Sequence, residues 1–273
     1  MKKIDKRCMD ATVAIGVATC NSQSKFWIGT GFLVGFTNWQ GGKEVYLLTN
    51  KHVVLNQQML YIRFNCLSSQ AKDFPLQIKN SQGVFQLSIH PKENVDIVAI
   101  SINVGFLENT GAAFDYFDLK DNALVADALN NGGYGEGSYV YAIGYPMNLV
   151  GQEKQYPICR QGCISRIADV YEHRSIEYLI DAQTFPGNSG GPVVVNDDLT
   201  TSGMTRLIGI LRAYIPYQEN LVSQQTGRQR SLMEENSGLT VVHTVDIILE
   251  TVKMEQDRVL MAAGQSPRMK LFV

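Results

Sequence analysis

The sequence carries little charge for its length. Charged residues make up 18% of its 273 residues, below the roughly 25% of an average soluble protein. Its 24 Lys and Arg residues against 26 Asp and Glu residues give a net charge of −2. A protein that contacts nucleic-acid phosphates needs a basic surplus, so this balance argues against a nucleic-acid partner. An apolar fraction of 45% excludes a disordered chain.

Long hydrophobic runs are also missing. No segment approaches the roughly 18 consecutive apolar residues of a membrane span, so we expect no membrane association. The N-terminal seven residues are rich in Lys and Arg, but the apolar stretch behind them, residues 11–18, is short and has no clear cleavage site. This stretch alternates like a strand rather than a signal peptide, and we expect a cytoplasmic protein.

The sequence lacks an even disulfide framework. Its five cysteines are Cys8, Cys20, Cys66, Cys159 and Cys163, and an odd number is unusual for a secreted protein of this size. Cys159 and Cys163 could form one half of a zinc site, but no second half follows. We therefore expect free thiols in a reducing compartment and no metal.

Short strands dominate the pattern that is present. The chain contains many short runs rich in Val, Ile, Tyr and Phe, separated by Gly, Asn, Asp and Pro clusters, which is typical of an all-β sandwich or barrel. Strands do not alternate with long helices, so an α/β fold is excluded. The expected strands are residues 12–19, 31–36, 45–49, 60–64, 97–102, 138–143, 179–182, 192–195, 207–211 and 239–245.

One helix follows the last expected strand. Asp246 can cap it, and apolar residues continue with helical spacing to about residue 257. We divide the chain into a first group of strands, 11–118, a second group, 119–245, and a C-terminal helix and tail, 246–273. Residues 68–81 and the polar segment 216–237 are expected to be loops, and the longer one is a candidate regulatory or self-cleavable element.

A serine on a glycine-rich turn is the first candidate catalytic residue. The segment Gly187-Asn188-Ser189-Gly190-Gly191 precedes an apolar strand. Its glycines permit unusual backbone angles and a close approach of a substrate backbone. Such a turn aims consecutive N–H groups at one point, so those of Gly187 and Ser189, with Asn188 between them, could form an oxyanion hole.

A histidine and an aspartate could activate this serine, because a hydroxyl is a weak nucleophile without a base. His52 lies directly after the apolar strand that ends in Thr49-Asn50. Asp96 lies at the start of the apolar segment 97–100, where a carboxylate needs a partner. An imidazole N–H is such a partner and would fix the tautomer that accepts the serine proton. His90 and His173 are expected at the surface, and His243 is expected to be packed in the last strand.

The order His52, Asp96, Ser189 is the order found in chymotrypsin-like enzymes, not in subtilisins or α/β-hydrolases. The sequence resembles the trypsin/chymotrypsin-like serine peptidases, and most closely the bacterial HtrA/Deg branch without a PDZ domain. The matching stretches are residues 29–34, 48–54, 95–100, 140–146, 162–165, 181–182, 187–192, 208–210 and 237–239.

This resemblance implies two packed six-stranded antiparallel β-barrels followed by a C-terminal helix, with the active site in the cleft between the barrels. It implies a serine endopeptidase that acts on a protein or peptide substrate through an acyl-enzyme. In that role His52 is the general base, Asp96 orients it, and Ser189 is the nucleophile. No metal or organic cofactor is implied.

Departures from the family pattern bear on activation and specificity. Asn188 stands where digestive members of the family carry an aspartate that pairs with a newly cut N-terminus. A neutral Asn cannot form this ion pair, so activation by such a cleavage is not expected. By resemblance, Gln183 would lie near the base of the specificity pocket, where a neutral residue does not favour Arg or Lys. Arg212, Ala213 and Tyr214 would line the substrate backbone, which would be added as an extra strand. We expect small or medium neutral side chains at the cleaved residue.

Two other functions remain open at this stage. The first is a catalytically silent binding or scaffold protein of the same fold, against which the presence of all three triad residues argues. The second is a hydrolase acting on esters, which comparison of peptide and ester turnover would distinguish. A regulatory protein partner is also expected, because an unrestrained cytoplasmic protease would be toxic.

Overall fold

The computed structural model describes residues 3–19, 24–37, 42–67, 70–196 and 204–264. The first group of strands forms one nine-stranded sheet with the order β5-β4-β1-β2-β3-β7-β6, to which β8 and β9 are added at β4 and β2. Its strands are β1 (Thr12–Ala18), β2 (Lys25–Thr37), β3 (Lys43–Thr49), β4 (Met59–Cys66), β5 (Lys72–Gln77), β6 (Ser88–Ile89), β7 (Val98–Ile102), β8 (Ala112–Ala113) and β9 (Phe117–Asp118).

The second group closes into a six-stranded antiparallel barrel with the order β10-β11-β12-β15-β14-β13. Its strands are β10 (Tyr139–Gly144), β11 (Ile158–Arg166), β12 (Glu177–Asp181), β13 (Pro192–Asn196), β14 (Thr205–Val222) and β15 (Gln229–Thr244).

These sheets confirm the all-β prediction, and each of the ten expected segments overlaps a strand. The count of six strands holds for the barrel but not for the first sheet, whose pairing forms an open path of more strands. One reason lies in residues 68–81, which were expected to be a loop. Residues 72–77 of this segment instead form the edge strand β5, which pairs with β4 from Met59 to Phe64.

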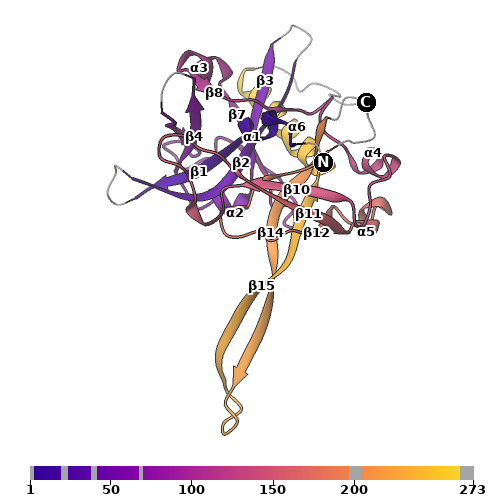
Figure 1. Ribbon diagram of the computed structural model, residues 1–273. Helices are drawn as coiled ribbons and strands as arrows, with labels where there is room; N and C mark the ends of the chain where they lie inside the picture. Colours follow the sequence, from indigo (N-terminus) through magenta and orange to yellow (C-terminus); the bar gives the residue numbers. More distant parts are fainter. Residues whose placement is uncertain (1–2, 20–23, 38–41, 68–69, 197–203, 265–273) are drawn as a thin grey trace.

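The segment 216–237 was also expected to be a loop, and this was wrong. It is the outer part of a long hairpin, in which β14 and β15 pair from Pro216↔Asn236 to Val222↔Gln229. In Figure 1 this hairpin, drawn in orange, projects well away from the body of the molecule. The side chains of 216–222 and 229–235 are all exposed. No apolar face is buried there, so the apolar alternation that marks a strand in a sequence is weak.

Helices are few and mostly short. They are α1 (Lys6–Asp10), α2 (Lys51–Val54), α3 (Val104–Asn109), α4 (Ala126–Asn131), α5 (Ala168–Tyr171), α6 (Val245–Ala262) and the 3₁₀ turn η1 (Pro146–Asn148). The predicted C-terminal helix is confirmed as α6, although it is longer than expected at both ends. Asp246 does not cap it; Thr244 precedes the helix, and Asp246 Oδ2 accepts a hydrogen bond from the Ala126 N–H at 2.9 Å. No helix within the described ranges is long and apolar enough to cross a membrane.

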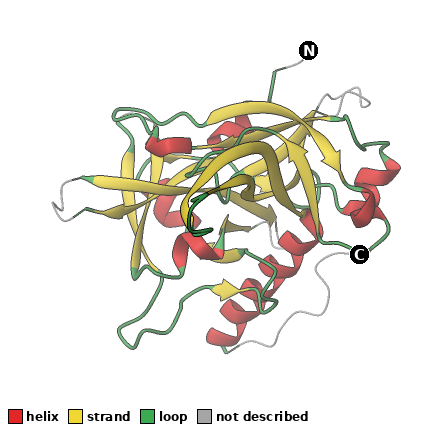
Figure 2. Cartoon of the chain, turned by 90° about the horizontal axis from the view of Figure 1, so that it is seen from below, coloured by secondary structure: helices red, strands yellow, loops and turns green. Residues whose placement is uncertain are grey.

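Helix α6 packs back onto the first sheet, and Figure 2 shows it lying along one side of the strands. Its Glu255 is fully buried. The carboxylate accepts hydrogen bonds from Ser88 Oγ at 2.9 Å and from the Ser101 N–H at 3.0 Å, and it pairs with Arg258. A buried carboxylate needs such partners, so these bonds fix the position of the helix.

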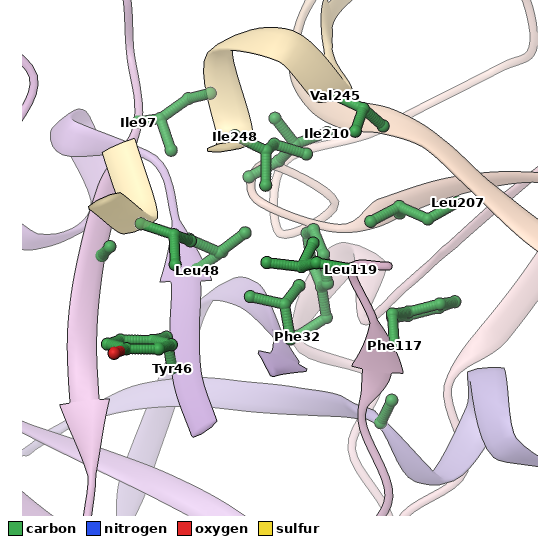
Figure 3. Close-up of a cluster of buried hydrophobic side chains, with 14 of the residues drawn as sticks. Phe32, Tyr46, Leu48, Ile97, Phe117, Leu119, Leu207, Ile210, Val245 and Ile248 are labelled. Atoms are coloured by element: carbon green, nitrogen blue, oxygen red, sulfur yellow. The ribbon is translucent and has the colours of Figure 1, made fainter. Parts of the chain in front are cut away.

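The main apolar core lies between the two sheets and α6. Figure 3 shows Phe32 and Leu48 of the first sheet, Leu207 and Ile210 of β14, and Ile248 of α6 pointing into one shared interior. All are buried, with at most 1% of their surface exposed. One continuous core therefore joins the two halves of the molecule, and this fixes the position of each half relative to the other.

Candidate active site

His52 and Asp96 are brought together by the first sheet. Strand β3 ends at Thr49, and His52 lies in the first turn of the short helix α2 that follows. Asp96 lies two residues before β7, the strand that pairs with β3. The His52 ring Nδ1 is 2.6 Å from Asp96 Oδ2, and the His52 backbone N–H donates to Oδ1 at 3.2 Å. With the proton on Nδ1, the lone pair of Nε2 is free to accept another proton.

The Asp96 carboxylate is held in its ionised form. Burial alone raises the pKa of Asp96, but the hydrogen bonds and charge of His52 more than offset this, so its pKa lies below the usual value. The Asn50 side-chain amide also donates to the Asp96 backbone carbonyl at 2.7 Å. Asp96 is thus an acceptor fixed on both its side chain and its main chain.

A second histidine lies behind Asp96 and was not predicted as part of the site. His243 of β15 is fully buried, and its Nε2 accepts a hydrogen bond from the Asp96 N–H at 3.1 Å. Its Nδ1 therefore carries the proton and lies 3.3 Å from Glu177 Oε1, although the two atoms do not form a hydrogen bond. Glu177 Oε1 accepts a hydrogen bond from Arg212 Nη1 at 2.6 Å. Burial, together with the Arg212 charge, lowers the pKa of His243 to about 4, which keeps the ring neutral. The sequence indicates only that this histidine is packed in the last strand, which its burial confirms.

Ser189 lies on a tight turn just before β13. The Asn188 N–H donates to the Phe185 carbonyl at 2.9 Å, and the turn holds Pro186 second and Gly187, with φ of 101°, third. This is the residue pattern of a type II turn. A Cβ added at Gly187 would lie 2.4 Å from the Tyr145 carbonyl oxygen, so only glycine fits.

The Gly187 N–H has a defined direction. The Pro186 carbonyl accepts a hydrogen bond from the Met147 N–H at 2.7 Å. In a planar trans peptide the N–H and C=O point opposite ways, so the Gly187 N–H points away from Met147. Within the described part of the chain, neither it nor the Ser189 N–H donates to a protein acceptor. Both donors are thus available to a ligand. The Asn188 side chain is buried, and its Oδ1 accepts from the Phe185 N–H.

Thr30 of β2 ties the first sheet to this turn. Its N–H donates to the Ser189 carbonyl at 3.0 Å, and its hydroxyl donates to the Gly187 carbonyl at 2.6 Å. The same hydroxyl accepts from the Tyr145 N–H at 2.9 Å. One residue of the first sheet therefore holds two carbonyls of this turn, those of Gly187 and Ser189. The Gly-Thr-Gly pattern at 29–31 was noticed in the sequence, but nothing local in it indicates this contact.

Ser189 and His52 line one cavity of about 290 Å³ between the two halves of the molecule. The expected residues Arg212, Ala213 and Tyr214 line it too, as do Gly187 and Asn188. In the described structure no hydrogen bond joins Ser189 Oγ to the His52 ring, and catalytic bonds are often long before substrate binds. The remaining lining residues are Ile28, Thr184, Phe185, Pro186, Leu211 and Thr240.

Gln183 does not line the cavity, contrary to expectation. Its side chain is exposed, whereas those of Ala182 and Thr184 on either side are buried. Alternation along an extended chain turns Thr184 inward in its place. Thr184 Oγ1 lies 2.8 Å from Thr240 Oγ1, which donates to the Ala182 carbonyl at 2.9 Å. Neutral hydroxyls therefore replace the expected amide in the cavity wall.

The other candidate residues lie apart from this site. His173 is exposed as expected, but His90 is buried with its Nε2 3.3 Å from Glu250 Oε1 of α6, so its expected surface position was wrong. Cys8, Cys66, Cys159 and Cys163 are free thiols; Cys20 lies outside the described residues. No group of three or more potential metal ligands gathers anywhere in the described ranges.

Comparison with solved structures gives several matches at low sequence identity. The protease domain of MamO from Magnetospirillum magneticum is 17% identical with a TM-score of 0.49, over 89% of this chain and 96% of that one. A serine endoprotease from Yersinia pestis is 18% identical with a TM-score of 0.48, over 91% of this chain and 64% of that one. The Rv3671c protease in its inactive form is 14% identical with a TM-score of 0.46, over 90% and 89%.

Comparison with curated protein sequences gives no significant match. The model of the trypsin-like peptidase domain family matches residues 29–204, which is more than half of the chain and includes His52, Asp96 and Ser189. The chain therefore belongs to the trypsin-like peptidase domain family.

Proposed function

We propose that this protein is a serine endopeptidase in which Ser189, His52 and Asp96 act together. The observation that carries the proposal is the short bond of 2.6 Å between Asp96 and His52, in the cavity that Ser189 also lines. In the neutral ring this bond places the proton on Nδ1, so that Nε2 carries the lone pair that accepts a proton. The ordering carboxylate and the base are thus prepared before a substrate arrives.

The first chemical step is attack on a peptide carbonyl. Ser189 Oγ forms a bond to the carbonyl carbon while His52 Nε2 takes the hydroxyl proton. The carbonyl oxygen becomes an anion, and the free N–H groups of Gly187 and Ser189 stabilise it. Each such donor contributes about 2.7–4 kcal/mol to the stability of the transition state.

The second step breaks the peptide bond. The His52 imidazolium gives its proton to the leaving amine, and an acyl group stays on Ser189. Water then attacks the acyl carbon while His52 Nε2 takes its proton. The bond between the acyl carbon and Ser189 Oγ breaks, the acid is released, and His52 returns the proton to Ser189 Oγ. The ionised Asp96 stabilises the imidazolium in both steps. No atom outside the chain, the peptide and water takes part.

The cavity walls suit a small or medium neutral side chain at the cleaved residue. Thr184 and Thr240 supply hydroxyls, and Leu211 and Ile28 supply apolar surface. Among the described residues that line the cavity, Arg212 is the one Lys, Arg, Asp or Glu, and its guanidinium is already paired with Glu177. This pairing leaves little charge for selecting a charged substrate residue.

Incubation of the purified protein with a peptide library, read by mass spectrometry, tests the proposal. The wild type should produce new termini that neither Ser189→Ala nor His52→Ala produces. Asp96→Asn should lower the rate by about 10⁴ because it favours the wrong tautomer of the base. Cleavage of esters but not of peptides would replace the proposal by an esterase, and cleavage by Ser189→Ala would contradict the assigned nucleophile.

A further inference from the structure

The cavity opens directly onto a free strand edge. Along β14, strand β13 pairs only as far as Ile210, and Leu211 exchanges the last two backbone bonds with Gly190 and Gly191. Beyond Leu211 the described pairing of β14 is with β15 alone, on its other edge. The free edge thus begins at the cavity residues Arg212, Ala213 and Tyr214 and leads into the projecting hairpin. On the way, the β14–β15 register shifts between Leu211 and Ala213 and between Tyr214 and Pro216.

From Ile215 to Val222 the edge extends for eight residues beyond the cavity. At about 3.4 Å per residue this free edge is about 27 Å long, and we call it the rail. Free edge N–H and C=O groups pair readily with another extended chain. Pro216 lacks an N–H and so offers no donor to an added strand.

The charge along the rail is uneven. In segments 213–222 and 231–236 there are three glutamates and no Lys or Arg. Glu219 and Glu235 share one face, because Glu219 is opposite Met233 and Glu235 is opposite Tyr217. Glu234 lies on the other face and accepts from Tyr214 Oη at 2.9 Å. Arg228 lies at the tip and Arg230 lies beside it at the start of β15, whereas Arg212 at the cavity end of the edge is paired with Glu177. A basic segment beside the inner hairpin would therefore meet complementary charge.

We propose that the hairpin is a docking rail for the substrate itself, which adds an extended, Lys- or Arg-bearing segment to β14 as a third strand. An antiparallel strand runs towards the body of the molecule and so reaches Ser189 with its N-terminal side on the hairpin. The preferred substrates are unfolded or loosely structured polypeptides with basic residues N-terminal to the cleaved bond. This inference rests on the proposed function for its register but concerns binding, so it can be tested without turnover.

The decisive experiment measures peptide binding to full-length Ser189→Ala protein by fluorescence anisotropy. The first probe is a labelled six-residue peptide of Ala and Val. The second carries eight further residues, with Lys at alternate positions, on its N-terminal side, and the third carries the same eight on its C-terminal side. We expect the N-terminal extension to tighten binding about tenfold, since several backbone bonds of modest net strength are added. The C-terminal extension should change it little.

Two matched peptides separate backbone pairing from charge. N-methylation of alternate backbone nitrogens in the N-terminal extension removes its N–H donors and should abolish the gain. Replacing its Lys residues by Glu should lower the gain several-fold through repulsion by Glu219 and Glu235.

The double variant Glu219→Gln/Glu235→Gln should bind the Lys and Glu peptides alike. Glu153→Gln, an exposed site on another loop, should keep the difference.

Shortening the hairpin tests the same point from the protein side. Joining Tyr217 to Glu235, a cross-strand pair, through an Asn-Gly turn removes the rail. The ratio of affinities for the N-extended and unextended peptides should then fall to about one. If this variant fails to fold, the N-methylated peptide and the glutamate variants still test the proposal.

Three results would overturn the proposal that the rail binds substrate. These are an equal gain from the C-terminal extension, a gain that survives N-methylation, and no gain at all. Hydrolysis of peptides by the wild type would in each case leave the proposed function standing.

Discussion

The nucleophile turn and the projecting hairpin belong to the same barrel but are built in opposite ways. In the turn, the carbonyls of Pro186, Gly187 and Ser189 each accept a hydrogen bond, and Thr30 of the other sheet supplies two of the three donors. In the outer hairpin the two strands pair with each other only, and their side chains are exposed. One region is fixed by contacts across the molecule, the other by its own ladder alone.

The difference separates two tasks. Stabilising a transition state requires donors held in place before the reaction, which the buried turn provides. Receiving different extended chains requires backbone groups that are exposed and unpaired, which the hairpin provides. A change in the turn should therefore affect both folding and catalysis, whereas a change in the hairpin should affect stability little.

The sharpest contrast is between two glycines with positive φ. A Cβ at Gly190, φ 84°, would lie 2.2 Å from the Thr30 carbonyl oxygen, whereas at Gly227 of the hairpin tip, φ 63°, it would meet nothing within 4 Å. We expect Gly190→Ala to destabilise the fold by more than about 3 kcal/mol and abolish activity. Gly227→Ala should cost less than about 1 kcal/mol, because the pairing of the hairpin is itself marginal and its tip can open to relieve the strained backbone angle. Urea unfolding of both variants measures the difference, and equal losses would contradict the contrast.

Acid should weaken the part of the molecule behind the triad. Burial lowers the pKa of His243 from 6.5 to about 4, so between these values the unfolded chain binds a proton that the folded chain refuses. Its contribution to stability is complete above about pH 6.5 and falls by about 3 kcal/mol as the pH drops to 4. The groups around His243 are Asp96, Glu177, Arg212, His90 and Lys51.

His243→Gln keeps an acceptor for the Asp96 N–H but cannot be protonated. The free energy of unfolding of this variant, measured by urea titration from pH 7 to 4, should depend less steeply on pH than that of the wild type. The buried His90, whose pKa is also lowered by burial, should leave a residual slope in the same direction. An unchanged slope would show that His243 is not held neutral.

Thr30→Val keeps the shape of the side chain but removes its hydroxyl. The Gly187 carbonyl loses a donor and the buried Tyr145 N–H loses an acceptor. We expect a loss of roughly 2 kcal/mol in stability. Activity should fall more than stability explains, by about tenfold to a hundredfold, because the turn that presents the Gly187 N–H is released. The matched variant Thr226→Val, at an exposed hairpin position, should stay within about 0.5 kcal/mol of the wild type. Equal kcat/KM for Thr30→Val and the wild type would exclude this positioning role.

The smallest effect on stability is expected at the hairpin itself. Replacing residues 218–234 by an Asn-Gly turn removes two exposed strands. Their pairing contributes little net free energy, since an isolated two-stranded hairpin is only marginally stable in water. The free energy of unfolding should change by less than about 1 kcal/mol. A larger loss, seen by thermal or urea unfolding, would mean that the hairpin supports the barrel and is not independent of it.

The sequence indicates the parts of this molecule that depend on local pattern. Short apolar strands, the apolar face of α6 and the order His52, Asp96, Ser189 are all visible in it, because each follows from neighbouring residues. The hairpin is missed because both of its faces are solvated, so no apolar alternation marks it. Gln183 was expected in the cavity wall, and Thr184 is found there instead. Resemblance fixes a position only to within one residue, and in an extended chain a shift of one residue turns the side chain to the opposite face.

The contacts made by Thr30 and His243 could not be predicted for a different reason. Thr30 meets the nucleophile turn 157 residues later in the chain, and His243 meets Asp96 147 residues earlier. Such pairs exist only once the two halves share one core, and no local spacing encodes them. They are the connections through which each half of the molecule positions the catalytic groups of the other.

Covalent labelling by a fluorophosphonate probe tests most directly whether these residues form a working site. The probe reacts only with a serine that a base activates and that lies beside oxyanion donors. We expect that the wild type is labelled at Ser189, shown by peptide mapping, and that Ser189→Ala and His52→Ala are not. A folded wild-type protein that stays unlabelled, or is labelled equally after His52→Ala, would contradict it.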